Sequence, residues 1–300
     1  MSAARGRHGP GGFLERELRK ALGDPALSVL ELAPVGGGCI HHAVRVGTTR
    51  GDWFAKWNDD CAPDLFLSEA EGLRALRAAG PGLAIPEVLV ALSPDDERPA
   101  CIVMEYLPPG KGAARDDVAL GHGLAAIHAQ PAAAFGFAVT TYCGPTPQDN
   151  RSSPSWAEFY AERRIRPLAR LLEEQGRIGP AERTRLDRLV ERLPSLLAHE
   201  TRPALIHGDL WSGNVLGTTR GPALVDPACA ACDREMEFGI TTLFGGFSER
   251  FFAAYHEALP LPGEWRERNP LYQLYHLLNH HLIFGGHYGA AALAIARRYA

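Results

Sequence analysis

The sequence lacks any long apolar segment. No run of about 18 apolar residues occurs in the chain, so we expect no transmembrane helix and no membrane partner. Residues 1–12 include basic residues but have no apolar stretch behind them, which argues against a secretory signal. We expect these residues to form a flexible tail.

The sequence also lacks a basic excess. Its formal net charge is −4 at pH 7, whereas a nucleic-acid-binding protein usually carries a basic patch or stripe. Arginines do cluster within residues 163–166, but the surrounding helical pattern contains Glu, which favours a solvated helix face. We therefore expect no nucleic-acid partner.

Cysteine is sparse for a chain of this length. The six cysteines are dispersed over 300 residues, and a chain this long has no need of disulfides to fold, which predicts a reducing, cytoplasmic location. Cys229 and Cys232 form a single C-x-x-C. A zinc site would need a second pair or histidines at ligand spacing, so we interpret this motif as chance spacing.

Apolar periodicity divides the chain into two parts. In the first part, a short helix over 13–22 and a helix over 64–79 accompany strand-like runs. These runs begin near Val29, and the best candidates cover 43–46, 53–57, 87–92 and 101–107. Pro108-Pro109-Gly110 ends the last run and resembles a hinge.

The second part is mostly helical. Helical patterns cover 116–128, 155–175, 181–199, 237–258, 270–284 and 290–299, and short apolar pieces at 204–206, 215–216 and 223–225 favour strands. We predict an α+β fold of two lobes. Residues 13–107 would form a small antiparallel β-rich N-lobe, and residues 108–300 a larger, mainly helical C-lobe.

The segment His207-Gly208-Asp209-Leu210-Trp211-Ser212-Gly213-Asn214 carries the strongest chemical pattern. Phosphoryl transfer from ATP needs an acceptor for the substrate hydroxyl proton and oxygen ligands for magnesium. Asp209 fits the base, Asn214 fits one magnesium ligand, and Asp226, after the apolar run 223–225, fits the second. This order resembles H-R-D-x-x-x-x-N followed by D-F-G in kinases, with Gly208 in place of the arginine and Asp226-Pro227-Ala228 in place of D-F-G.

The first part of the chain supplies further residues in kinase order. Gly36, Gly37 and Gly38 lie between two strand candidates, where backbone N–H groups could cover phosphates, although a Gly-rich hairpin turn would look the same. Lys56 lies among large apolar neighbours and therefore needs a charged partner. Glu69 on the following helix is our choice for that partner, and Glu71 is the alternative.

The end of the last N-lobe strand could meet the nucleotide base. In a kinase arrangement the backbone from Glu105 to Leu107 would face the adenine edge. An ordinary strand end predicts the same residues, so the sequence leaves both interpretations open.

Together these residues resemble the fructosamine kinase (ketosamine 3-kinase) family, which is related to the aminoglycoside phosphotransferases and has a protein-kinase-like fold. The resemblance covers about residues 13–300. The segments that carry it are Gly37–Ile40, Tyr142–Gln148, Glu162–Pro167, His207–Asn214, Leu243–Phe247 and Leu271–His280.

The resemblance implies an ATP- and Mg2+-dependent ketosamine 3-kinase. Such enzymes phosphorylate the sugar of fructosamines or ribulosamines, and the product then decomposes and releases the amine, which amounts to deglycation. Trp211 would pack against the sugar or the amine, because an indole face suits both a C–H surface and a cation. A core tryptophan that braces the loop is the other interpretation.

The sequence departs from the family near the glycine-rich turn. His41-His42 stands where the family usually has Asn, which puts the contacts of this loop with phosphate in doubt. Cys39 is similar to a loop cysteine that links two chains in some relatives, so a redox-sensitive homodimer and a monomer are both open. A buried free thiol is an equally good interpretation.

Two other functions remain open from sequence alone. Other small-molecule kinases of this fold, acting on aminoglycosides, choline or homoserine, would share the same carboxylates and amide. A nucleotide-binding pseudokinase is the alternative outside catalysis, although such proteins usually lack one of the essential residues. The sequence has no recognisable A-P-E motif, which disfavours a Ser/Thr protein kinase.

Overall fold

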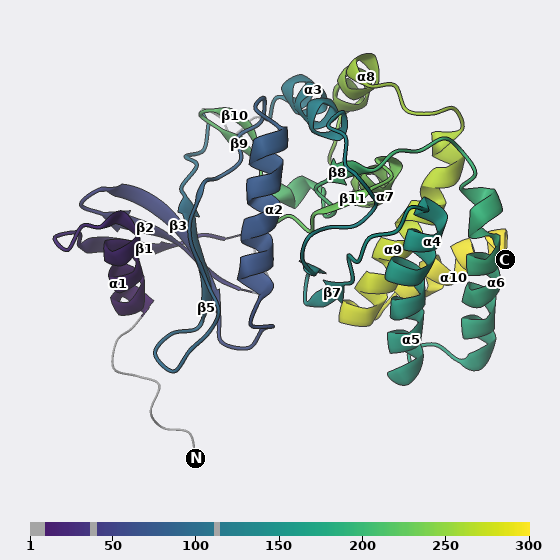
Figure 1. Cartoon of the computed structure of the whole chain (residues 1–300), viewed down its shortest axis with the longest axis horizontal. Coiled ribbons are helices and arrows are strands. Elements are labelled where there is room, and N and C mark those ends of the chain that lie inside the picture. The colour runs from purple at the N-terminus through teal and green to yellow at the C-terminus, as the bar shows by residue number, and fades with distance from the viewer. Residues whose placement is uncertain (1–9, 37–40, 111–114) are drawn as a thin grey trace.

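The computed structural model describes residues 10–36, 41–110 and 115–300 (Figure 1). The first part is a five-stranded antiparallel sheet in the order β1-β2-β3-β5-β4 with one helix on each face. Its elements are α1 (Pro10–Leu22), β1 (Val29–Pro34), β2 (His42–Thr48), β3 (Gly51–Asn58), α2 (Leu65–Ala79), β4 (Val88–Leu92) and β5 (Ala100–Glu105).

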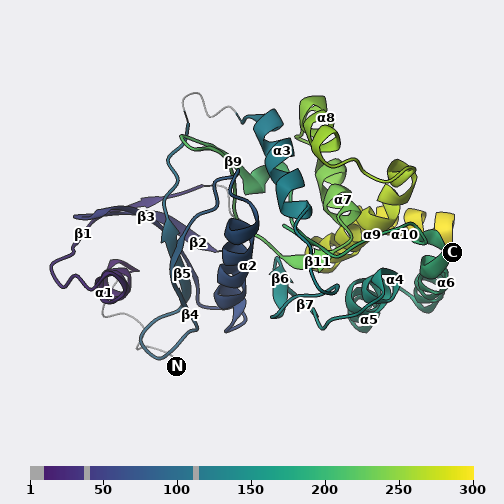
Figure 2. The ribbon, with the colours of Figure 1, turned by 45° about the horizontal axis from the view of Figure 1, so that its top comes forward.

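Alternation along the strands decides which helix each side chain faces. In β5, Cys101 and Val103 pack with α1, whereas Ala100, Ile102 and Met104 pack with α2. Figures 1 and 2 show α1 and α2 on opposite sides of this sheet. In β3, Ala55 and Trp57 share the α1 face, so Lys56 between them points to the other face, toward α2.

The second part is mainly helical, as expected. Its helices are α3 (Asp117–His128), α4 (Trp156–Tyr160), the π-helical turn η2 (Ala161–Ile165), α5 (Arg166–Glu174), α6 (Pro180–Leu196), α7 (Glu235–Phe244), α8 (Glu249–Ala258), α9 (Trp265–Phe284) and α10 (Tyr288–Tyr299). Short antiparallel pairs lie among them: β6 (Thr141–Cys143) with β7 (Thr146–Gln148), β8 (Ala204–Ile206) with β11 (Ala230–Cys232), and β9 (Val215–Thr218) with β10 (Gly221–Leu224).

The two parts are joined by backbone hydrogen bonds as well as by the chain. The β9–β10 ribbon of the second part bonds to the hinge segment, through Thr219 N–H to Pro108 O at 3.0 Å and Gly110 N–H to Gly217 O at 3.0 Å. It also bonds to the α2–β4 connection, where Ala84 N–H donates to Pro222 O at 3.0 Å. The ribbon therefore ties the sheet to the loops that follow β8 and β10.

Several boundaries differ from the sequence-based prediction. The predicted tail over 1–12 is wrong at its end, because α1 begins at Pro10, whose fixed φ suits the start of a helix. The predicted single helix over 237–258 is two helices, α7 and α8. They are separated at Gly245 and Gly246, which have φ of 68° and 86°. These values lie outside the α-helical region, so the helix cannot continue through them.

The remaining differences concern short elements. The predicted helix over 155–175 contains the π-helical turn η2, and β6, β7 and β11 were not predicted, because strands of three residues carry no periodic signal. None of the helices in the described ranges is long and apolar enough to cross a bilayer. The five cysteines in those ranges are free thiols.

Candidate active site

The loop that follows β8 closes on itself through Asn214. The amide nitrogen of Asn214 donates to the backbone oxygen of Asp209 at 2.8 Å and to its carboxylate Oδ2 at 3.0 Å. Asn214 is buried, at 6% exposure, within the short 3-10 turn η3 (Ser212–Asn214). With both amide hydrogens engaged, the Oδ1 of Asn214 has no hydrogen bond in the described part of the chain and is left for another ligand.

The ring of His207 joins this loop to the turn that follows β10. Its Nε2 lies 2.9 Å from the backbone oxygen of Val225, and its Nδ1 lies 3.3 Å from the backbone N–H of Asp209. Nε2 is therefore the donor and Nδ1 the acceptor, which is the neutral form of the ring. Burial lowers the pKa of His207 and favours the same form. With both nitrogens used by backbone, His207 positions the loop and is not available as a base.

Gly208 allows the loop to pass close to the next turn. Its φ is +80°, and a Cβ at this position would lie 2.2 Å from the backbone oxygen of Ala228. No side chain fits there, which explains why Gly208 stands in place of the arginine of the kinase motif.

A buried carboxylate binds the backbone at the start of the loop. Glu237 on α7 is 0% exposed and accepts the backbone N–H groups of His207, at 2.5 Å, and Gly208, at 3.0 Å. Sequence reasoning placed Glu237 only at the start of a helix. An acidic residue in the first turn of a helix usually faces solvent, so no sequence signal marked it.

Lys56 brings the two parts of the chain together. Its ammonium group lies 2.7 Å from a carboxylate oxygen of Glu69 and 2.7 Å from Oδ1 of Asp226. Burial would lower the pKa of Lys56, but the charges of Asp226 and Glu69 outweigh this effect and raise the pKa. The ammonium group therefore stays charged at any physiological pH.

Asp226 has an unusual backbone conformation. Its φ is 56°, a left-handed value that Asp tolerates better than most residues. Burial would raise the pKa of Asp226, but the charge of Lys56 prevails and lowers it. Its side chain is 46% exposed, so an ionised carboxylate remains accessible beside Lys56.

The carboxyl group of Asp209 has a strongly raised pKa. Burial raises the pKa of its carboxyl to about 8, the bond from Asn214 opposes that shift, and the negative charges of Asp226 and Glu237 add to it. A carboxylate with a pKa near the working pH is well matched to the role of a general base.

The positions of Glu69 and Glu71 in the structure decide which of them pairs with Lys56. Glu69 is buried against Lys56, whereas Glu71 lies on the exposed face of α2 and bonds to Arg74 at 2.6 Å. Gly36 is exposed after β1 and has open space where a Cβ would lie. Gly37, Gly38 and Cys39 lie outside the described residues.

The strand end at the hinge has free backbone groups. The carboxylate of Glu105 forms an ion pair with Arg220 and lies 3.9 Å from Arg77. The backbone N–H of Glu105 donates to the backbone oxygen of Glu87 at 2.8 Å. The side chain of Leu107 is buried, but within the described ranges its backbone N–H and C=O have no hydrogen bond. A free N–H donor and a free C=O acceptor next to each other can pair with the acceptor and the donor on the edge of an adenine ring.

Trp211 and His41 are two further ring side chains singled out by the sequence. Trp211 is 37% exposed and lies over Gly213, where a Cβ would meet the indole at 2.2 Å, so it is not a core residue. His41 contacts the Phe66 ring and lies 3.0 Å from the Asn58 amide. Burial, aided by the charge of Lys56, lowers the pKa of His41 to about 4, so it is neutral at pH 7.

Comparison with known proteins fits this geometry. A family profile described as fructosamine kinase matches residues 14–299. The chain belongs to the fructosamine kinase family. An Enterococcus faecium protein named "Probable ketoamine kinase" is 35% identical over 87% of this chain and 92% of its own length. The chloroplastic protein-ribulosamine 3-kinase of Arabidopsis thaliana is 34% identical over 91% of this chain and 84% of its own length.

Solved structures of the fructosamine kinase family and its neighbours confirm the fold. A Thermobifida fusca protein described as a candidate fructosamine-3-kinase superposes with a TM-score of 0.82 and 34% identity, covering 95% of this chain and 97% of that one. The aminoglycoside phosphotransferase APH(4)-Ia, in complex with AMP-PNP and hygromycin B, has a TM-score of 0.60 at 18% identity, covering 95% of this chain and 98% of that one. The latter likeness concerns the fold alone, and it confirms the predicted two-lobed, kinase-like α+β class.

Proposed function

We propose that the protein transfers the γ-phosphoryl group of ATP to a sugar hydroxyl of a ketosamine, with Asp209 as the base. The observation that carries the proposal is the convergence of two turns. Lys56 bonds to Asp226 on one turn, Asn214 bonds to Asp209 on the other, and His207 joins the two. Catalysis of phosphoryl transfer is mostly positioning and electrostatics, which this arrangement supplies.

The donor atoms suit a magnesium nucleotide. Asp226 offers an accessible ionised carboxylate and Asn214 an amide oxygen without another partner in the described ranges, and magnesium prefers such oxygen ligands. Magnesium, when bound, neutralises charge on the transferred phosphoryl group. Lys56 would contact phosphate, held in place by Glu69. Gly36, Gly37 and Gly38 would cover the phosphates, and the backbone from Glu105 to Leu107 would meet the adenine edge.

Asp209 would accept the proton of the attacking hydroxyl. Its Oδ2 accepts a hydrogen bond from Asn214, and its Oδ1 has only a 4.0 Å contact with the thiol of Cys143, so Oδ1 is the oxygen that would receive the proton. The raised pKa makes the carboxylate a stronger base than an exposed Asp, and Asn214 keeps it at a fixed angle. The exposed indole of Trp211, which belongs to the same loop as Asp209, would pack on the sugar or the amine of the substrate.

Relatives with substrate-specific names favour a ketosamine over other acceptors. Several relatives are named ketoamine kinase or protein-ribulosamine 3-kinase. We assign phosphorylation to the third hydroxyl of a fructosamine or ribulosamine on this basis, and deglycation as the consequence. A monomer and a homodimer linked through Cys39 both agree with the proposal, as does a cytoplasmic location.

An ADP-release assay tests the proposal. Ribuloselysine, fructoselysine, an aminoglycoside and choline should be compared side by side, and we expect turnover with one or both ketosamines. Turnover only with the aminoglycoside or choline would assign a different kinase of the same fold. ATP binding with no ADP release from any acceptor would identify a pseudokinase.

A further inference from the structure

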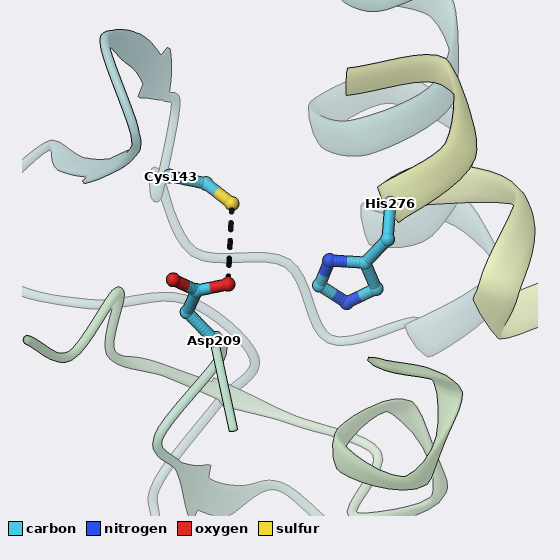
Figure 3. A group of neighbouring side chains, drawn as sticks. All are labelled: Cys143, Asp209 and His276. Carbon is cyan, nitrogen blue, oxygen red and sulfur yellow. Dashed lines mark hydrogen bonds between the residues drawn. The ribbon is translucent and has the colours of Figure 1, made fainter. Parts of the chain in front are cut away.

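Three side chains of different chemistry meet beside the proposed base. Cys143 comes from β6, Asp209 from the loop after β8, and His276 from α9. Figure 3 shows them directed toward one another. The Sγ of Cys143 lies 4.0 Å from Oδ1 of Asp209, and one ligand atom from each of the three residues lies within 4.8 Å of the others. The elements are distant in sequence, so no local motif explains the grouping.

His276 supplies a second, independent observation. It is 1% exposed, and its Nδ1 has no hydrogen-bond partner in the described part of the chain. A buried polar atom without a partner costs about 1–3 kcal/mol, so native proteins rarely keep one without a role. Phosphoryl transfer uses Asp209 but assigns no task to His276 or to Cys143.

A second group of metal-ligand residues serves as a comparison. His199, Asp233 and Glu235 also lie within ligand distance of one another. In that group, Oδ2 of Asp233 already accepts hydrogen bonds from His199 and Tyr272 at 2.6 Å each. Both carboxylate oxygens of Glu235 accept hydrogen bonds from the guanidinium group of Arg268. The carboxylate oxygens of this group are therefore engaged, whereas Oδ1 of Asp209 has only the 4.0 Å contact with Cys143. Nδ1 of His199 also has no hydrogen-bond partner in the described ranges, but the engaged carboxylates make the group a structural network.

We propose that Cys143, Asp209 and His276 form an inhibitory binding site for a zinc ion. A thiolate, an imidazole and a carboxylate are typical zinc ligands, and zinc with three protein ligands keeps a fourth position open. Zinc bonds of about 2.0–2.3 Å place tetrahedral ligands roughly 3.3–3.7 Å apart, so the three atoms, which lie within 4.8 Å of one another, need to approach by about 1.5 Å at most. Magnesium prefers oxygen ligands and is disfavoured by the sulfur of Cys143.

Zinc at this site would block the base, a conclusion that rests on the proposed function. The carboxylate of Asp209 would bind zinc through the lone pair that otherwise accepts the proton of the substrate hydroxyl. Binding displaces the thiol proton of Cys143 to solvent, because the thiolate is the ligand. The ion sits where the sugar hydroxyl must approach, so inhibition is competitive with the ketosamine and not with MgATP.

Cobalt binding tests the site without reference to activity. Co2+ substitutes for zinc and gives a thiolate-to-metal charge-transfer band that reports sulfur ligation. We expect one Co2+ per chain with this band in the wild type, no band in Cys143→Ser, and affinity at least about tenfold weaker in His276→Gln. Cys61→Ser and His287→Gln change residues outside the group and should bind as the wild type does. A band that survives in Cys143→Ser, or no stoichiometric binding by the wild type, would overturn the proposal.

Inhibition tests the consequence separately. With free zinc buffered and MgATP in excess, each variant's turnover is expressed relative to its own zinc-free rate. Zinc should raise the KM for the ketosamine in the wild type, and Cys143→Ser should need at least about tenfold more zinc for the same effect. If the wild type and Cys143→Ser were equally sensitive to zinc, the proposed inhibition through this site would be wrong. Cobalt binding without any ketosamine turnover would leave the metal site standing and remove only the proposed function. Circular dichroism confirms that each variant is folded.

Discussion

Removal of the carboxylate charge at Glu237 should weaken both the fold and catalysis, although Glu237 does not touch the reacting atoms. Its two oxygens accept the N–H groups of His207 and Gly208, and the side chain is fully buried. An unsatisfied buried N–H costs about 1–3 kcal/mol, so Glu237→Ala would lose about 2–6 kcal/mol. This is a large part of a typical stability of about 5–15 kcal/mol, and that variant could fail to fold.

Glu237→Gln is therefore the informative variant. It keeps one acceptor oxygen but turns an NH2 group toward the second N–H, so we expect a loss of about 1–3 kcal/mol in the free energy of unfolding. The displaced loop should lower kcat by roughly tenfold to a hundredfold, because small shifts of a catalytic group are costly. Urea unfolding and steady-state turnover measure the two effects. Glu191→Gln, on the exposed face of α6, is the matched control.

If Glu237→Gln matched the Glu191→Gln control in both assays, Glu237 would not hold the loop in place. A loss of stability without a change in kcat would mean that the loop keeps its geometry by other contacts. In that case the bonds to Glu237 would be purely structural.

Further predictions concern the two turns themselves. Because the pKa of Asp209 is raised to about 8, the base is protonated below that pH, and kcat/KM for MgATP should fall about tenfold per unit as pH decreases from 8. A flat profile between about pH 6 and 8 would contradict this assignment. Asp226→Ala should weaken ATP binding in a Mg2+ titration, whereas Asp96→Ala, at an exposed site, should leave binding unchanged. Gly208→Ala should lose more unfolding free energy than Gly176→Ala. Both positions have positive φ, which costs about 1–2 kcal/mol, but only Gly208 also lacks space for a Cβ.

The parts of the site that the sequence predicted are those that local spacing determines. The loop from His207 to Asn214 is one continuous segment, so its residue types already specify that a carboxylate and an amide lie close together. Lys56 was predicted to need a partner because it lies in an apolar strand, and Glu69 and Glu71 are the two glutamates of the helix that follows. The contacts of Lys56 select Glu69.

The parts that sequence reasoning missed depend on tertiary contacts. Glu237, Cys143 and His276 come from different elements and meet the loop only in the folded chain. A buried acidic residue on a helix has the same sequence pattern as an exposed one. Cys143 lies in a segment that resembled the family, but that resemblance gave no role to its thiol.

The break between α7 and α8 has a related physical cause. Residues 237–258 have a continuous helical pattern, yet Gly245 and Gly246 adopt positive φ. A Cβ on Gly246 would lie 2.6 Å from the Cβ of Ser212, so this turn packs closely against the loop from His207 to Asn214. Only the tertiary contact reveals why two glycines stand there.

In the proposed reaction, Asp209 accepts the proton of a sugar hydroxyl while the other groups hold the nucleotide. The most direct test of this role is phosphoryl transfer from labelled ATP to ribuloselysine or fructoselysine by Asp209→Asn, with nucleotide affinity measured on the same preparation. We predict that transfer falls by about 10²–10⁴-fold while ATP affinity stays close to that of the wild type. Transfer at the wild-type rate by Asp209→Asn would contradict the account.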